Sequence, residues 1–148
     1  MKEWDGAAED PPQVVGEHLA PFQAPSFGEH EPRFTHFTQN LPGLAWIKDL
    51  QGRYLYANEA ARRILGAAET AIVGKTDAEL FPPLTAAQFR ANDQIVITGK
   101  RAIQTTEELH QADGLHRSLV SKFPIFGKDG EVVLVGGMAI DITEHLKI

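Results

Sequence analysis

A regular pattern of hydrophobic and polar positions begins at Phe34. Phe34, Phe37 and Leu41 recur at helical spacing and a Pro-Gly pair follows them, which predicts a short helix that ends there. Residues 44–48 and 53–57 are two short runs, rich in apolar and aromatic residues, on either side of a glycine-containing turn. Two such runs joined by a short turn predict a β-hairpin.

Helical segments are predicted after this hairpin. Asn58 is a suitable N-cap for the first of them, and Gly66 is suited to its C-terminal end. Residues 76–79 and 85–88 match the capping-box pattern, which predicts the start of a short helix and of a longer one that Gly99 closes.

Three further strands are predicted over residues 102–111, 115–123 and 132–142, with an Asp-Gly pair before the second and before the third. The chain therefore contains five antiparallel strands with the helices gathered between the second and the third. This order predicts an α+β fold in which short helices cover one face of a five-stranded antiparallel sheet. A core or a cavity is expected between the two layers.

Residues 1–33 differ from the remainder of the chain. They hold seven acidic and two basic residues, a net charge of −5, whereas the whole chain carries −6. Five of the nine prolines also lie there, and proline at this spacing disfavours a continuous helix or a central strand. We therefore predict an irregular acidic arm over 1–33, loose or docked through its apolar residues, and one domain over 34–148.

Composition excludes several classes of protein. The chain has no cysteine, which excludes disulfides, thiolate metal sites and cysteine nucleophiles. Hydrophobic residues make up 43% and charged residues 23%, as in ordinary soluble domains. No apolar run approaches the roughly 20 residues that span a bilayer, and no basic cluster suggests a nucleic-acid surface. We predict a cytoplasmic protein without a membrane or nucleic-acid partner.

Several sequence strings, in this order along the chain, resemble those of PAS domains, the sensory modules of signalling proteins. The strings are LPGLAWIKD at 41–49, GRYLYAN at 52–58, VGKTD at 73–77, FRAND at 89–93, KFP at 122–124 and DITE at 141–144. The resemblance covers 34–148. It implies a regulatory domain that binds a small ligand, dimerises, or does both, and biases a downstream effector, most often a histidine kinase or a diguanylate cyclase. Asp141, Ile142 and Thr143 would form the signal exit.

The resemblance also indicates which cofactors this chain could bind. Light-sensing relatives form a flavin adduct with a cysteine, which this chain lacks, and Gln88 stands where one type of haem sensor has its histidine. His110 and His116 are the nearest approach to a metal pair, without a third ligand. We therefore expect no metal, no haem and no covalent flavin adduct.

In PAS domains, the face of the first strand that carries Trp46 and Lys48 points toward the cavity. Strand alternation extends this face to the other strands. The candidate cavity residues are Trp46, Lys48, Leu55, Arg90, Thr105, Glu107, Ser118, Val120 and Lys122. Two interpretations remain open: the basic residues bind a small anionic metabolite, or Glu107 pairs with one lysine and the others extend outward.

The same alternation places Tyr54 and Tyr56 on the outer face of the sheet with Ile47. Phe34 and Phe37 belong to the helix that precedes this face. Either that helix or the acidic arm covers the face within one chain, or the face forms a homodimer contact.

Asp77 and Asp93 could be interpreted as paired carboxylates for acid–base chemistry. Asp77, however, starts a helix, where its charge complements the helix dipole, and Asp93 is expected to cap or pair locally. No base, nucleophile and orienting group converge in the sequence, so we predict a regulatory domain without enzymatic activity. A small-molecule enzyme built on an α+β cavity and an interaction module without a ligand remain the alternatives.

Overall fold

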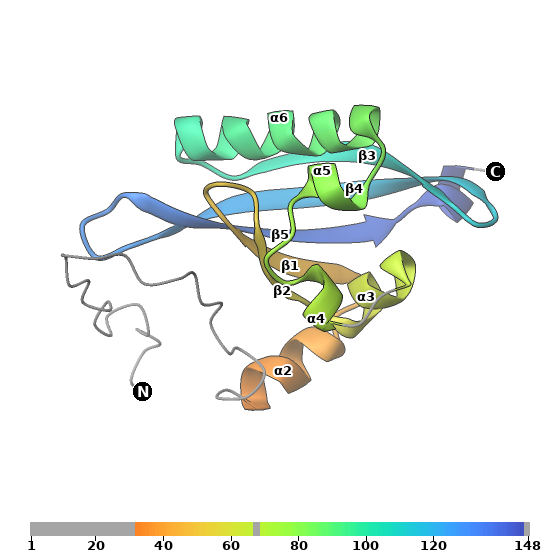
Figure 1. Ribbon diagram of the computed structural model, residues 1–148, viewed down its shortest axis with the longest axis horizontal. Coiled ribbons are helices and arrows are strands. Elements are labelled where there is room, and N and C mark those ends of the chain that lie inside the picture. Colours follow the sequence, from red (N-terminus) through yellow and green to blue (C-terminus); the bar gives the residue numbers. More distant parts are fainter. Residues whose placement is uncertain (1–31, 67–68, 147–148) are drawn as a thin grey trace.

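The computed structural model describes residues 32–66 and 69–146 of the chain (Figure 1). Its elements, in chain order, are α2 (Pro32–Gln39), β1 (Leu44–Asp49), β2 (Tyr54–Ala57), α3 (Glu59–Leu65), α4 (Glu69–Ile72), α5 (Asp77–Leu80), α6 (Pro83–Gly99), β3 (Ile103–Gln111), β4 (Gly114–Phe126), β5 (Val132–Asp141) and the 3₁₀ helix η2 (Thr143–Leu146). The predicted acidic arm, apart from its last two residues, lies outside the described residues.

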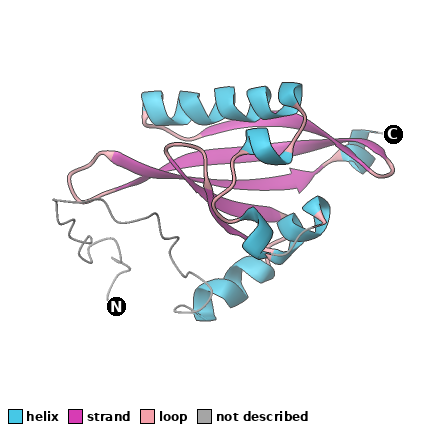
Figure 2. Ribbon diagram, viewed as in Figure 1, coloured by secondary structure: helices cyan, strands magenta, loops and turns pink. Residues whose placement is uncertain are grey.

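The five strands form one antiparallel sheet in the order β2-β1-β5-β4-β3 (Figure 2). The helix α6 packs along β3, β4 and β5, whereas α3 and α4 pack against β1 and β2. These helices lie between β2 and β3 in the chain, so the predicted α+β fold is confirmed. The interior between the two groups of helices and the sheet contains the cavity described below.

Local capping explains where the helices begin and end. The Asn58 side chain accepts a hydrogen bond from the Ala61 N–H at the start of α3, and Gly66 adopts the left-handed conformation at its end, both as predicted. The capping box at residues 76–79 is also present at α5. The helix α4 was not predicted from the sequence.

The start of α6 differs from the prediction. This helix begins at Pro83 and not at the capping box of residues 85–88. The fixed φ of proline suits the first helical position, where its missing N–H has no intrahelical partner to lose. The helix ends at Gly99, but Lys100, with φ of 56°, is the residue that adopts the left-handed conformation.

A β-bulge in β2 reverses the predicted orientation of Tyr54. Trp46 pairs with Ala57 and Ile47 with Tyr56, but Lys48 pairs with Tyr54, so the register shifts across one extra residue, Leu55. Tyr54 therefore shares the inner face with Lys48, while Tyr56 stays on the outer face. The placement of Tyr54 on the outer face was wrong because strict alternation does not hold across a bulge.

The outer face at Tyr56 is covered by α2. The Phe34 ring packs edge-on against the Tyr56 ring with centroids 5.1 Å apart, and the Tyr56 hydroxyl hydrogen-bonds the Thr38 hydroxyl. Coverage of this face by the helix within one chain is therefore present at Tyr56. Phe37 of the same helix remains 67% exposed, and Ile47 is half-buried.

Candidate functional site

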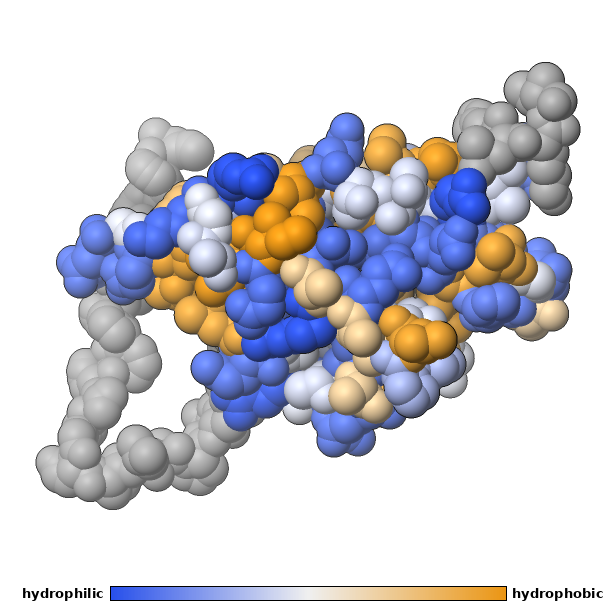
Figure 3. Space-filling view, turned by 90° about the horizontal axis from the view of Figure 1, so that it is seen from above, coloured by the Kyte–Doolittle hydropathy of each residue, from blue (hydrophilic) through white to orange (hydrophobic). Residues whose placement is uncertain are grey.

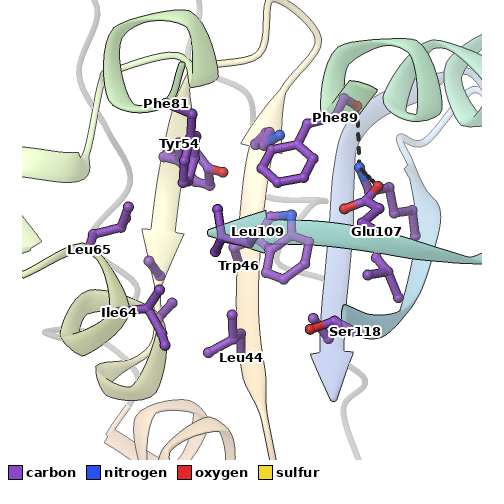
Figure 4. Close-up of a pocket in the computed structure, with 16 residues that line it drawn as sticks. Leu44, Trp46, Tyr54, Ile64, Leu65, Phe81, Phe89, Glu107, Leu109 and Ser118 are labelled. Atoms are coloured by element: carbon purple, nitrogen blue, oxygen red, sulfur yellow. Dashed lines mark hydrogen bonds and ion pairs between the residues drawn. The ribbon is translucent and has the colours of Figure 1, made fainter. Parts of the chain in front are cut away.

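A cavity of about 70 Å³ lies between the sheet and the helices (Figure 4). One end is polar and contains Glu107, near the Phe89 ring. The other end is apolar and lies between Leu44 and Ile64, with Ser118 at its side (Figure 4). The cavity is smaller than the roughly 300–1,000 Å³ of sites for drug-sized ligands. As it stands, it accommodates a small guest.

The structure brings six of the nine candidate cavity residues together around this space. They are Trp46, Lys48, Glu107, Ser118, Val120 and Lys122. The other three lie outside the lining. Leu55 is the extra residue of the bulge, Arg90 donates a hydrogen bond to the Leu50 carbonyl at 3.2 Å, and Thr105 lies farther along β3. The prediction that Leu55 and Arg90 face the cavity was wrong. Thr105 does lie on the inner face, because it pairs with Val120, but it is not part of the lining.

Lys48 is buried at the polar end, with 1% of its surface exposed. Its ammonium nitrogen lies 2.6 Å from an Asp77 carboxylate oxygen and 2.8 Å from one of Asp93. It also lies 4.9 Å from the centre of the Tyr54 ring. Lys48 therefore does not extend outward, as one interpretation of the sequence required. It joins α5 and α6 to β1 through charge-assisted hydrogen bonds.

Lys122 of β4 is equally buried and has a matching set of partners. Its ammonium nitrogen lies 3.0 Å from Asp93, 2.9 Å from Glu107 and 3.3 Å from the Phe89 carbonyl oxygen. Asn92 donates a further hydrogen bond to Glu107 at 2.9 Å. The predicted pairing of Glu107 with one lysine is present. We call Lys48, Lys122, Asp77, Asp93 and Glu107 the charged cluster.

Tyr54 adds a hydrogen bond to the charged cluster. Its hydroxyl donates to Asp77 at 2.6 Å. Burial, and then the negative charge of Asp77, raise the pKa of the Tyr54 phenol well above its ordinary value. The phenol therefore stays protonated and acts as a donor, which is the role that the buried carboxylate requires.

The sequence analysis assigned Asp77 to the helix dipole and Asp93 to a local cap or pair, and it missed that both contact Lys48. Asp77 does start α5, but its carboxylate points inward to Lys48 and Tyr54. Asp93 is buried on α6, where it follows Phe89 by four residues and precedes the buried Val96 by three. That spacing puts the aspartate on the apolar stripe of the helix, and this was the signal available in the sequence.

The indole of Trp46 presents an unpaired donor at the cavity. Its Nε1 is buried and has no hydrogen-bond partner among the described residues. The ring lies flat against Gly137 of β5, where a Cβ atom would come within 2.4 Å of the indole carbons. Any side chain at Gly137 would displace the ring, so glycine is required for this position of Trp46.

The exit segment, Asp141 to Thr143, is hydrogen-bonded to residues of β4. His116 Nδ1 lies 2.5 Å from an Asp141 carboxylate oxygen, and His116 Nε2 lies 2.6 Å from Asp113 at the tip of the β3–β4 hairpin. The Arg117 N–H donates to the Thr143 hydroxyl at 2.9 Å, and the Ile142 N–H donates to the Arg117 carbonyl at 2.9 Å. One imidazole thus bridges the hairpin and the end of β5.

This bridge predicts a pH-dependent exit segment. Hydrogen bonds to Asp141 and Asp113 raise the pKa of His116, so the stability from its charge is fully present below the unfolded-state pKa and is lost as pH rises through the folded-state value. Burial opposes ionisation of Asp141, but hydrogen bonds from Thr143 and His116 lower its pKa, so its contribution is lost as pH falls through that lower value. The bridge is strongest between the two values.

Proton NMR of the histidine rings measures this directly, with His116→Gln to assign the resonance. We expect a His116 midpoint above the ordinary 6.5 and a lower midpoint in Asp113→Asn. A His116 midpoint at or below the ordinary 6.5 contradicts the bridge.

The described residues contain no group of three or more His, Cys, Asp or Glu side chains placed to hold a metal ion. Both ring nitrogens of His116 contact aspartates, Asp113 and Asp141. His110 lies on the opposite face of the β3–β4 hairpin, because it pairs with Leu115 whereas His116 pairs with Leu109. Within the described part of the chain, no helix is long and apolar enough to span a bilayer.

Comparison with known proteins finds a family model and several relatives that are similar to this chain. A family model described as the PAS fold matches residues 38–146. A methanogenesis regulatory histidine kinase, FilI of Methanothrix harundinacea, is 27% identical over 114 residues, or 77% of this chain. A diguanylate cyclase of Vibrio cholerae is 28% identical over 106 residues, or 70% of this chain. The chain spans 13% of the length of the kinase and 33% of the length of the cyclase.

Among solved structures, the crystal structure of a VqmA–ligand–DNA complex from Vibrio cholerae is similar to this chain, with a TM-score of 0.67 and 27% identity. The similarity covers 76% of this chain and 51% of that one.

Proposed function

This chain belongs to the PAS fold family, and from that premise we propose that it is a sensory domain whose cavity binds a small molecule and whose exit segment passes the bound state to an effector. Ligand binding shifts the populations of two arrangements of the sheet and the exit segment, to the extent that the ligand binds one of them more tightly. The similarity of this chain to VqmA, which was crystallised as a ligand–DNA complex, supports the proposal that the cavity binds a ligand.

The observation that carries this proposal is the proximity of the cavity to the exit segment. Ser118 of β4 and Ala139 of β5 both line the cavity. Ser118 is paired across the sheet with Asp141, and Ala139 precedes Asp141 by two residues on β5. A guest that displaces these two strands therefore acts on the residues that hold the exit segment.

Binding of a guest larger than the present cavity requires a side chain to move. Ile64 of α3 lines the apolar end and is 38% exposed, so it is the lining residue that solvent reaches most easily. The polar end is held in place by the charged cluster. We therefore propose that the ligand enters beside α3.

The cavity itself is the target of the test. Ala139→Leu fills part of the 70 Å³ with a larger side chain, while the exposed Ala87→Leu on α6 serves as the matched control. We expect native mass spectrometry and a thermal-shift screen of metabolites to identify a compound that binds the wild type and Ala87→Leu but not Ala139→Leu. The absence of any compound with this pattern contradicts ligand binding in the cavity.

The effector is proposed from the relatives alone. FilI is a histidine kinase and the Vibrio cholerae relative is a diguanylate cyclase, so we propose an attached effector of one of these kinds, with a histidine kinase first. A regulatory role without catalysis also fits the pairing of charged side chains in the interior. In the charged cluster the lysines and carboxylates are partners of one another, an arrangement suited to holding the fold together.

A second candidate function, dimerisation without a ligand, is favoured by the small cavity and by the outer face of the sheet. Leu119, Phe123 and Ile140 alternate with inward residues on β4 and β5 and are each more than a third exposed. We call these three residues the outer-face patch. By contrast, the side of the molecule that carries α6 shows apolar residues in separate patches among hydrophilic ones (Figure 3).

We propose a homodimer in which the outer-face patch meets a second copy of the chain. Leu119→Lys places a charge at the patch and is expected to shift the oligomeric state measured by light scattering from dimer to monomer. Leu84→Lys, on the exposed surface of α6, is expected to leave the dimer unchanged. A wild type that stays monomeric at high concentration contradicts the homodimer.

A further inference from the structure

The two lysines at the cavity are held by the carboxylates of the charged cluster. An ammonium group carries three N–H bonds. Lys122 donates a hydrogen bond to the Phe89 carbonyl and is ion-paired with Asp93 and Glu107. Lys48 has Asp77 and Asp93, and its remaining side faces the Tyr54 ring. An anion in the cavity could contact either ammonium group closely only by displacing one of these partners.

The charge of the cluster also opposes an anion. Two ammonium groups face three carboxylates, so the formal sum is −1, and all five side chains are buried. A further negative charge in this interior would lose its hydration without gaining an unpaired cation. The anionic metabolite, one of the two interpretations of the sequence, is therefore disfavoured, because the lysines that suggested it are paired with Asp77 and Asp93.

What the cavity does offer is one unused donor. The Trp46 Nε1–H is buried without a partner among the described residues, and an indole nitrogen donates but does not accept. In Figure 4 this nitrogen lies on the side of the ring that faces Phe89. The remainder of the lining, away from the polar end, includes the apolar side chains of Leu44 and Val120. A hydrogen-bond acceptor on an apolar body would satisfy this donor.

We propose, on the basis of the function proposed above, that the ligand is a small uncharged molecule that accepts a hydrogen bond from Trp46 Nε1. Trp46 supplies the polar recognition, and the apolar wall accommodates the remainder of the ligand. The charged cluster does not contact the ligand through its lysines. Its contribution is to disfavour anions, because its formal charge is negative and both lysines are already ion-paired with carboxylates.

Three probes of the same chain length test the class of ligand: butyramide, butyrate and butylammonium. Each is titrated into the ¹⁵N-labelled chain while the Trp46 indole N–H resonance is followed, with Trp46→Phe to assign it between the two tryptophans. We expect butyramide to shift this resonance saturably and to bind at least about tenfold more tightly than either charged probe. In Trp46→Phe, which keeps an aromatic ring but lacks the donor, we expect butyramide to bind about tenfold more weakly.

The outcomes separate this inference from the proposed function. Binding of butyrate or butylammonium as tight as that of butyramide overturns the uncharged ligand but leaves a ligand-binding cavity in place. Butyramide binding that is unchanged by Trp46→Phe overturns the role of the indole. If none of the three probes saturably shifts any resonance of the residues that line the cavity, the proposed ligand-binding function fails together with the inference.

Discussion

Replacement of Lys48 with methionine is expected to lower the free energy of unfolding by about 3–5 kcal/mol, the usual cost of removing one member of a buried ion pair. Methionine approximates the length of the lysine chain, so packing is largely kept. Asp77 and Asp93, which Lys48 contacts at 2.6 and 2.8 Å, would lose their shared cation in the interior. Urea unfolding followed by circular dichroism measures the change.

The matched control is Lys128→Met, because Lys128 is an exposed lysine in the turn between β4 and β5. That variant is expected to lie within about 0.5 kcal/mol of the wild type. If Lys48→Met also lies within this range, the buried contacts of Lys48 do not hold α5 and α6 to the sheet.

The second large effect is expected at Asn58, where we predict a loss of about 3 kcal/mol in Asn58→Ala. The buried Asn58 side chain accepts hydrogen bonds from the N–H groups of Ala45 and Ala61, each at 3.1 Å. Its amide group donates to the carbonyls of Thr38 at 2.9 Å and Gly43 at 3.1 Å. Alanine would leave these backbone groups without their partner and would also remove the N-cap of α3.

Asn58→Asp serves as the control, because a carboxylate still accepts from the two N–H groups but donates to neither carbonyl. Its stability in urea unfolding is expected to lie between those of the wild type and Asn58→Ala. Equal losses in the two variants would show that the acceptor half of the side chain contributes nothing, against the predicted capping role.

Much of the fold followed from the sequence, because turns and caps depend on nearby residues. The Asp-Gly pairs, Asn58 and Gly66 act through their own backbone neighbourhood, so the sequence of strands along the chain and the start of α3 were predicted correctly. The bulge at Leu55 was not predicted. It depends on how β2 pairs with β1, and a single extra residue reverses which side chains face inward.

The cavity was predicted only in part. Trp46 and Lys48 were placed correctly because alternation within β1 is regular. The partners of Lys48 were missed, since a carboxylate is usually solvated and nothing local in the sequence distinguishes Asp93 from a surface residue except its place on an apolar stripe. The error had a chemical consequence, because lysines without their carboxylates suggested an anionic ligand.

The outer-face patch could also be predicted from the sequence. Val120 and Lys122 were correctly assigned to the inner face, so alternation along β4 required Leu119 and Phe123 to face outward. The sequence instead predicted an outer-face contact at the two tyrosines of β2, but α2 covers one of them and the other lies at the cavity.

The central claim is that a guest in the cavity acts on the exit segment through β4 and β5. The most direct measurement is an amide-resonance titration of the chain with butyramide, following Ser118 and Ala139 at the cavity together with Asp141 and Thr143 at the exit segment. We predict that all four resonances shift along one saturation curve. Saturable shifts at Ser118 and Ala139 with unmoved resonances at Asp141 and Thr143 would contradict the claim.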